Sequence, residues 1–138
     1  MEEIAQARTE DATSLADLYA KAFESTGFKE FALPEKRGEL IVWLEGLCGA
    51  GKLWFSRDDA GVVSLGHYEP DKDEVVTIAT RDGMEGNGHA TTMLRKLASI
   101  YPTSKVRPVT RGGKAVAERC GFSPSPNDES LWVRIVRS

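Results

Sequence analysis

Two glycines separated by one residue form the segment of this chain with the most distinctive chemistry. The segment is Gly86-Asn87-Gly88-His89-Ala90, which follows a run of β-branched residues and precedes a run with helical spacing. At such a strand-to-helix turn several backbone N–H groups lack partners, and the positive end of the helix dipole points the same way. Glycine leaves room for an anion and adopts left-handed conformations. The segment therefore predicts a phosphate-binding turn, with turn geometry alone as the alternative explanation.

A second glycine-containing segment matches a nucleotide-binding P-loop only in part. The residues from Gly46 to Lys52 fit the pattern G-x-x-x-x-G-K. A P-loop continues with a serine or threonine that contacts magnesium, and it runs from a strand into a helix. Here the next residue is Leu53, and the segment runs from a predicted helix into a predicted strand. We therefore exclude an NTPase site.

The spacing of apolar residues predicts the elements before the turn. Ile4–Arg8 reads as a short strand, and helical periodicity covers Leu15–Phe23 and, after a proline, Leu40–Cys48. From Lys52 onward the period changes to two, which predicts strands at Leu53–Ser56 and Gly61–Tyr68 joined by a hairpin-like turn. Two helices therefore precede an antiparallel sheet.

The glycine turn itself lies between a predicted central strand and a predicted helix. Val75–Thr80 is dense in β-branched residues, and apolar residues recur at helical spacing from Ala90 to Tyr101. Beyond this helix the pattern predicts a strand at Lys105–Val109, a short helix at Lys114–Cys120, a loop at Ser123–Pro126 and a last strand at Leu131–Val136. The strand at Val75–Thr80, the glycine turn and the helix after it form one unit.

Composition restricts the class of protein. With 138 residues, 41% of them hydrophobic and 28% charged, the chain is expected to form one soluble globular domain over residues 1–138. No signal or membrane-spanning segment is recognisable, so a cytoplasmic location is predicted. A net charge of −3 argues against nucleic acid as a partner. Cys48 and Cys120 are far apart and have no neighbours at metal-ligand spacing, so neither a disulfide nor a metal site is expected.

The strand, turn and helix resemble the GNAT acyltransferase family, whose fourth strand leads into a turn of the form Q/R-x-x-G-x-G/A. In the stretch Ile78–Ala90, Gly88 and Ala90 occupy the two small positions, and Glu85 stands where the family has glutamine or arginine. A second stretch, Ala115–Phe122, is similar to the family's helix that ends in Gly-Phe. The order of predicted elements is also similar over nearly the whole chain.

This resemblance implies an α/β (α+β) fold with a mixed, mostly antiparallel sheet of six or seven strands and about four helices. Strands 4 and 5 of the family splay apart, and the pantetheine arm of acetyl-CoA lies between them. The backbone of Ile78 and Thr80 would pair with that arm. The pyrophosphate would bind the turn, whose residues are Glu85, Gly86, Asn87, Gly88, His89 and Ala90. Glu85 places an acid close to this expected anion.

The implied reaction is direct attack of an amine on the thioester, with no metal. It requires a general base, for which the sequence offers Glu74, Glu69 and His67. Each has an alternative explanation, because His67 alternates with apolar residues on one strand face and the two glutamates flank a polar turn. Relatives carry a tyrosine acid four residues before the glycine of Gly-Phe, whereas this chain has Ala117 there. Water would then protonate the thiolate.

Two other readings stay open from sequence alone. The protein would be a non-catalytic acyl-CoA-binding sensor or partner-binding subunit of the same fold, or its glycines would serve only the turn. The acceptor is expected to be a small-molecule or peptide amine. The excess of acids between Glu24 and Glu39 is explained either by a cationic acceptor or by a solvated helix face. A monomer and a homodimer are equally compatible with the sequence.

Overall fold

The structure is a computed structural model that describes residues 3–24, 29–81, 83–84, 86, 88–102, 104–108 and 111–134, except for the side chains of Phe23, Lys29 and Phe31. Its centre is a seven-stranded sheet in the order β1-β2-β3-β4-β5-β7-β6. The strands are β1 (Ile4–Gln6), β2 (Leu53–Asp58), β3 (Gly61–Glu69), β4 (Glu74–Thr80), β5 (Lys105–Val106), β6 (Phe122–Ser125) and β7 (Asp128–Arg134). Every neighbouring pair is antiparallel except β4 and β5, which are parallel. The predicted mixed, mostly antiparallel sheet is confirmed.

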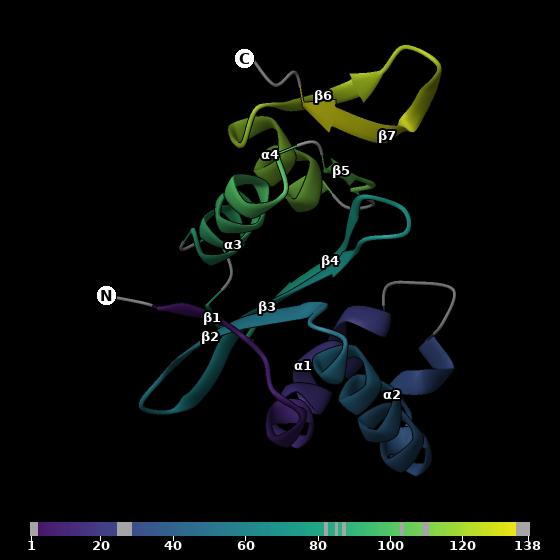
Figure 1. Ribbon diagram of the computed structural model, residues 1–138, viewed down its shortest axis with the longest axis vertical. Coiled ribbons are helices and arrows are strands. Elements are labelled where there is room, and N and C mark those ends of the chain that lie inside the picture. Colours follow the sequence, from purple (N-terminus) through teal and green to yellow (C-terminus); the bar gives the residue numbers. More distant parts are fainter. Residues whose placement is uncertain are drawn as a thin grey trace.

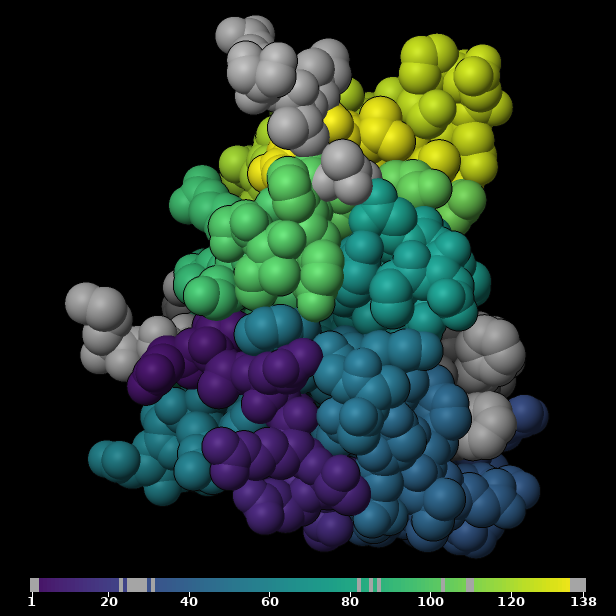
Figure 2. Space-filling view, viewed as in Figure 1, coloured from purple at the N-terminus to yellow at the C-terminus, as the bar shows by residue number. Residues whose placement is uncertain are grey.

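Four helices cover the two faces of the sheet. They are α1 (Ala12–Phe23), α2 (Arg37–Gly49), α3 (His89–Ile100) and α4 (Arg111–Arg119). The pair α1 and α2 lies at one end of the molecule and α3 and α4 lie toward the other, near β5, β6 and β7 (Figure 1). In the space-filling view, green and teal residues lie between the purple and blue N-terminal part and the yellow C-terminal hairpin (Figure 2). β4 therefore joins two parts of the fold.

Each helix pair buries its own apolar cluster. One cluster lies under α1 and α2 and includes Leu15, Leu44 and Leu65, all of which are fully buried. The other lies under α3 and includes Met93, Leu97 and Trp132. Among the helices of the described ranges, none is long and apolar enough to cross a membrane.

The C-terminal third differs from the sequence prediction. The loop predicted at Ser123–Pro126 is wrong, because β6 pairs antiparallel with β7 over this segment. β6 is the last strand of the sheet, and an edge strand tolerates a proline such as Pro124 because one side of its ladder needs no N–H donor. β7 also begins earlier than expected, at Asp128, and α4 begins at Arg111 in spite of the two glycines that follow.

One glycine of β3 is required by packing against α3. A Cβ atom on Gly66 would lie 2.8 Å from Leu97 Cδ1 and 2.9 Å from Met93 Cγ. Gly66→Ala should therefore overpack this cluster and lower the free energy of unfolding by about 1–3 kcal/mol. Gly46→Ala is the control, because nothing lies within 4 Å of its Cβ position in α2. This substitution should raise the free energy of unfolding by about 0.5–1 kcal/mol. Equal stabilities of the two variants in denaturant titrations would contradict this packing.

Candidate functional site

A cleft opens where β4 and β5 separate. The two strands share only the pairs Glu74↔Lys105 and Val75↔Val106. From Thr77 to Thr80, β4 pairs with no strand on this side within the described chain. A cleft of about 590 Å³ occupies the gap, and both Ile78 and Thr80 line it. The splay predicted from the resemblance is therefore present, with the edge of β4 along one wall, and the volume lies within the range of ligand sites.

The charges that line this cleft are all positive. Its lining contains Lys21, Arg107 and Arg119 and, within the described part of the chain, no acidic side chain. Most other lining side chains are apolar or small, among them Ile78 and Leu94. The Nζ of Lys21 donates a hydrogen bond of 3.2 Å to the carbonyl oxygen of Thr80. This combination fits a long ligand with an apolar stem and an anionic group.

The glycine turn lies at the end of the cleft, where α3 begins. Gly83, Gly86 and Gly88 have φ values of +83°, +83° and +86°, in the left-handed region that favours glycine. Gly88 is the N-cap residue of α3, and a Cβ on any of the three would meet nothing within 4 Å. The described glycines of the turn thus leave open space beside the N-terminus of α3, the end of a helix that favours anions.

The predicted cofactor residues around this turn divide into two groups. Gly86 and Ala90 line the cleft, and His89 is the first residue of α3. Glu85 and Asn87 lie outside the described residues, so the placement of the acid near the turn stays a prediction. Gly88, the N-cap residue of α3, has a left-handed backbone conformation, and binding of an anion there stays a prediction.

A bulge interrupts β4 beside the cleft. Across the β3–β4 ladder His67 faces Thr77 and Tyr68 faces Val75, so Val76 is an extra residue without a partner in β3. Such a residue leaves the regular ladder, and bulges often re-aim groups at functional sites. Val76 lines the cleft, and 42% of it is exposed. The bulge thus places the backbone groups of Val76 outside the ladder, next to the point where β4 and β5 begin to separate.

A buried chain of polar groups starts at the cleft wall and crosses to α1. Tyr19 Oη lies 3.2 Å from Thr77 Oγ1, and Thr77 lines the cleft. The same hydroxyl lies 2.7 Å from His67 Nδ1, and His67 is only 4% exposed. On the far side of the ring, Nε2 lies 3.4 Å from Glu69 Oε2, while Glu69 Oε1 pairs with Lys52 Nζ at 2.7 Å. Hydroxyl contacts therefore join Thr77 to His67, and the Nε2 side of the ring lies next to the Glu69–Lys52 ion pair but makes no hydrogen bond within the described residues.

The proton positions along this path follow from its two ends. The Tyr19 hydroxyl carries one proton, so it donates either to Thr77 or to His67 Nδ1. If it donates to Thr77, the bare lone pair of His67 Nε2 faces the Glu69 carboxylate, which is unfavourable. If it donates to Nδ1, the Nε2–H points toward Glu69 and Thr77 can donate to Tyr19. The geometry of the Tyr19–Thr77 contact has the Tyr19 hydroxyl as the donor. A base role of His67 requires the second arrangement, in which Nδ1 accepts from Tyr19 and Thr77 turns its own proton toward Tyr19.

The surroundings hold these groups in defined protonation states. Burial lowers the pKa of His67, so the imidazole is neutral at neutral pH. Burial raises the pKa of Tyr19 to about 12, so the phenol keeps its proton. The Lys52 ammonium lowers the pKa of Glu69, which stays ionised. Trp43 packs edge-on against Tyr19 and against His67, with ring centroids 5.3 and 6.1 Å apart. These contacts therefore place a neutral imidazole beside an ionised carboxylate.

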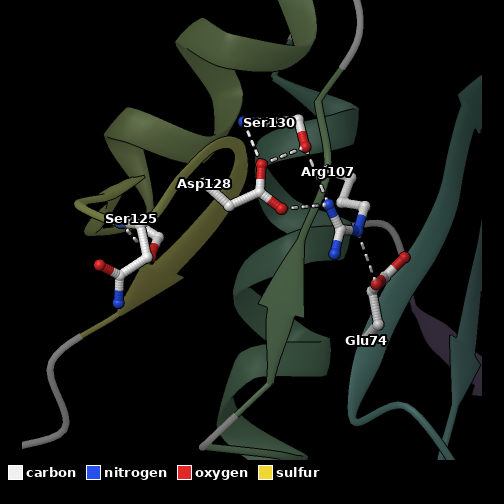
Figure 3. A network of polar contacts seen from close by, with 6 residues as sticks. Glu74, Arg107, Ser125, Asp128 and Ser130 are labelled. Atoms are coloured by element: carbon white, nitrogen blue, oxygen red, sulfur yellow. Dashed lines mark hydrogen bonds and ion pairs between the residues drawn. The ribbon is translucent and has the colours of Figure 1, made fainter.

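Glu74, the third candidate base, takes part in a separate ion-pair network. Its Oε1 lies 3.3 Å from Arg107 Nε, and Arg107 also contacts the β6–β7 hairpin (Figure 3). Glu74 faces Glu69 across the β3–β4 ladder, but each carboxylate pairs with its own cation. The structure thus brings His67 and Glu69 together and ties Glu74 to Arg107. A role of any of the three as the base stays a prediction.

Sequence patterns gave no reason to single out Tyr19 or Lys21. Tyr19 fits the apolar stripe of α1 and is buried in it, so only its hydroxyl contacts reveal a polar role. Lys21 belongs to the same helix and resembles any solvent-facing lysine in sequence. Ala117, at the family's tyrosine position, is buried and lines the cleft. The residues that sequence reasoning missed all depend on contacts between distant elements.

Comparison with known proteins identifies the fold. Neither a search of protein-family models nor a search of curated sequences gave a match. Among solved structures, a PaiA N-acetyltransferase from Thermoplasma acidophilum in complex with coenzyme A is similar, with a TM-score of 0.70 at 12% identity over 96% of both chains. A GNAT-family acetyltransferase from Bacillus cereus has a TM-score of 0.71 at 14% identity over 99% of both.

A third structure is similar as well. A GNAT-family acetyltransferase from Brucella melitensis in complex with acetyl-CoA has a TM-score of 0.68 at 14% identity, over 100% of this chain and 90% of that one. Within the described ranges, no group of three or more His, Cys, Asp or Glu side chains is arranged to hold a metal ion. The mixed sheet, the splayed fourth and fifth strands and the glycine turn together show that this chain has the fold of the GNAT N-acetyltransferases.

Proposed function

We propose that this protein is an N-acetyltransferase that transfers the acetyl group of acetyl-CoA to a primary amine of a small molecule or peptide. The observation that carries the proposal is the cleft between β4 and β5, which has cationic and apolar lining and ends at the left-handed turn of Gly88. Similar folds include structures with CoA and with acetyl-CoA bound. A cytoplasmic location, and a monomer or homodimer, stay predictions.

The residues present fit the cofactor in three places. The open glycine turn and the N-terminus of α3 would hold the pyrophosphate. The backbone of Ile78 and the N–H of Thr80, whose carbonyl oxygen accepts from Lys21, would pair with the amide groups of the pantetheine arm. Lys21 and Arg119 would add positive charge. Acetyl-CoA supplies an activated acyl group as a thioester. The carbonyl oxygen needs a donor when negative charge develops on it, and the backbone at the Val76 bulge is the candidate.

The polar path to His67 supplies the base. As the amine nitrogen bonds to the acyl carbon and the carbon–sulfur bond breaks, the nitrogen must lose a proton and the thiolate must gain one. Thr77 Oγ would take the proton from nitrogen and pass its own to Tyr19, which would pass its own to His67 Nδ1. The Glu69 carboxylate would stabilise the resulting imidazolium. Since Ala117 offers no acid, water would protonate the thiolate.

The pH dependence of the rate tests this base. His67 must be neutral to accept a proton, and burial lowers its pKa below the usual value of about 6.5. The wild-type rate should therefore be insensitive to this group at neutral pH and fall as pH drops through the lowered pKa. Because the acceptor amine also titrates, the ratio of wild-type to His67→Gln rates is the proper measure. Equal rates of the wild type and His67→Gln throughout the pH range would exclude His67 as the base.

The second candidate function is acyl-CoA binding without transfer, which the buried Ala117 at the family's tyrosine position favours. A thiol-release assay with acetyl-CoA and a panel of amines and peptides separates the two functions. Transfer predicts release of CoA that depends on the amine and on Thr77 and His67. Tight binding of acetyl-CoA with no amine-dependent release across the panel would favour the sensor.

A further inference from the structure

The joint between the two halves of the sheet contains few backbone interactions. β5 has only two residues, and both of its neighbours contact it through two register pairs. One further backbone bond joins Lys105 N–H to the Asp73 carbonyl oxygen at 2.8 Å. The cleft opens directly beyond this joint, so its width depends on how β4 is held relative to β5 and β7.

Arg107 bridges this joint with its guanidinium. Its Nε donates to Glu74 Oε1 of β4 at 3.3 Å, and its Nη1 lies 3.1 Å from Asp128 Oδ2 and 2.9 Å from Ser130 Oγ of β7. Asp128 is held in turn by the backbone N–H and the hydroxyl of Ser130, at 3.0 and 2.7 Å. In Figure 3 Arg107 lies between the Glu74 side chain and the hairpin residues. One side chain therefore connects β4 to the β6–β7 hairpin.

From these contacts we infer that Arg107 is a positioning residue that sets the width of the cleft between β4 and β5. The inference rests on the proposed function, because it concerns how tightly that cleft holds CoA. A planar guanidinium can bond two carboxylates in fixed directions at once, which a lysine ammonium does less well. Arg107 follows the last paired residue of β5, Val106, so it acts where the strands begin to diverge.

The arrangement also separates a positioning role from direct contact with CoA. Arg107 lines the cleft, whereas Asp128 does not. If Arg107 acts by holding the hairpin against β4, then Asp128→Asn should weaken CoA binding although Asp128 does not line the cleft. If Arg107 only contacts CoA, Arg107→Gln alone should weaken binding.

Calorimetric titration with CoA tests this difference. Arg107→Gln and Asp128→Asn should each weaken CoA binding about 5- to 10-fold. The double variant should bind CoA no more weakly than Arg107→Gln alone, because both substitutions break the same Arg107–Asp128 contact. Arg37→Gln is the matched control. Arg37 pairs with Asp17 between α1 and α2, and its side chain is 43% exposed, close to the 46% of Arg107. The control should bind CoA as the wild type does.

Hydrogen exchange of the backbone amides provides a readout that needs no cofactor. In Arg107→Gln and Asp128→Asn, the amides of Lys105 and Val106 should exchange faster, while those of β2 and β3 should not change. Wild-type affinity in Asp128→Asn together with unchanged exchange at β5 would overturn the inference. A wild-type protein that bound no CoA would count against the proposed function alone, since the exchange result would still decide the role of Arg107.

Discussion

Replacing Gly88 with valine is expected to weaken binding of CoA and acetyl-CoA by about 100-fold or more while the chain stays folded. Gly88 has a φ of +86° at the start of α3, and its Cβ position faces open space. A branched side chain would occupy that space and shield the helix N-terminus, where the pyrophosphate is proposed to bind. Calorimetry with CoA and circular dichroism on the same sample would measure the two effects.

Gly61→Val is the matched control for this substitution. Gly61 also has a positive φ, +128°, with nothing within 4 Å of its Cβ position, but it lies in the β2–β3 hairpin. Both variants therefore carry backbone strain, of roughly 1–2 kcal/mol, and only Gly88→Val lies at the turn. Loss of binding in both would show that strain rather than the glycine turn is responsible. Unchanged affinity in a folded Gly88→Val variant would remove the phosphate turn from the proposal.

Tyr19→Phe is expected to lower kcat by about 100-fold and to leave the affinity for acetyl-CoA unchanged. The hydroxyl lies 3.2 Å from Thr77 Oγ1 and 2.7 Å from His67 Nδ1, so its removal breaks the proposed proton path. The ring remains to pack against Trp43. Steady-state rates with a responsive amine, together with calorimetric binding of acetyl-CoA, separate loss of chemistry from loss of binding.

Tyr101→Phe serves as the control for loss of a hydroxyl. Tyr101 stacks on Tyr68 with ring centroids 3.7 Å apart, in the cluster under α3, and its ring is untouched by the change. Its rate should match the wild type. Equal kcat values for Tyr19→Phe and Tyr101→Phe would mean that the path from Thr77 to His67 carries no proton in the reaction.

Local sequence patterns predicted the glycine turn and its flanking elements because the signals are themselves local. β-branched residues at Val75–Thr80, left-handed glycines and helical spacing after Ala90 all act within a few residues. The resemblance extended these to a splayed sheet, and the two-residue contact of β5 with β4 bears that out. Identities of 11–15% to solved structures show that this fold needs few shared residues.

The polar path and the β6–β7 hairpin were beyond such patterns for different reasons. Tyr19 lies 48 residues from His67 and 58 from Thr77, and no periodicity records which buried hydroxyl meets which ring. The hairpin was missed because two prolines near Ser125 favour a loop locally. A strand at the edge of the sheet, such as β6, tolerates proline, but only the assembled sheet shows which strand is at the edge.

Calorimetric titration of acetyl-CoA and free CoA into the wild-type protein tests the assignment of the cleft most directly. Binding at micromolar concentration with a stoichiometry of about one is expected, since the turn at Gly88, the edge of β4 and three cations converge on one site of this size. No binding of either compound by the folded protein would contradict the proposal. The cleft between β4 and β5 would then have to serve a different ligand.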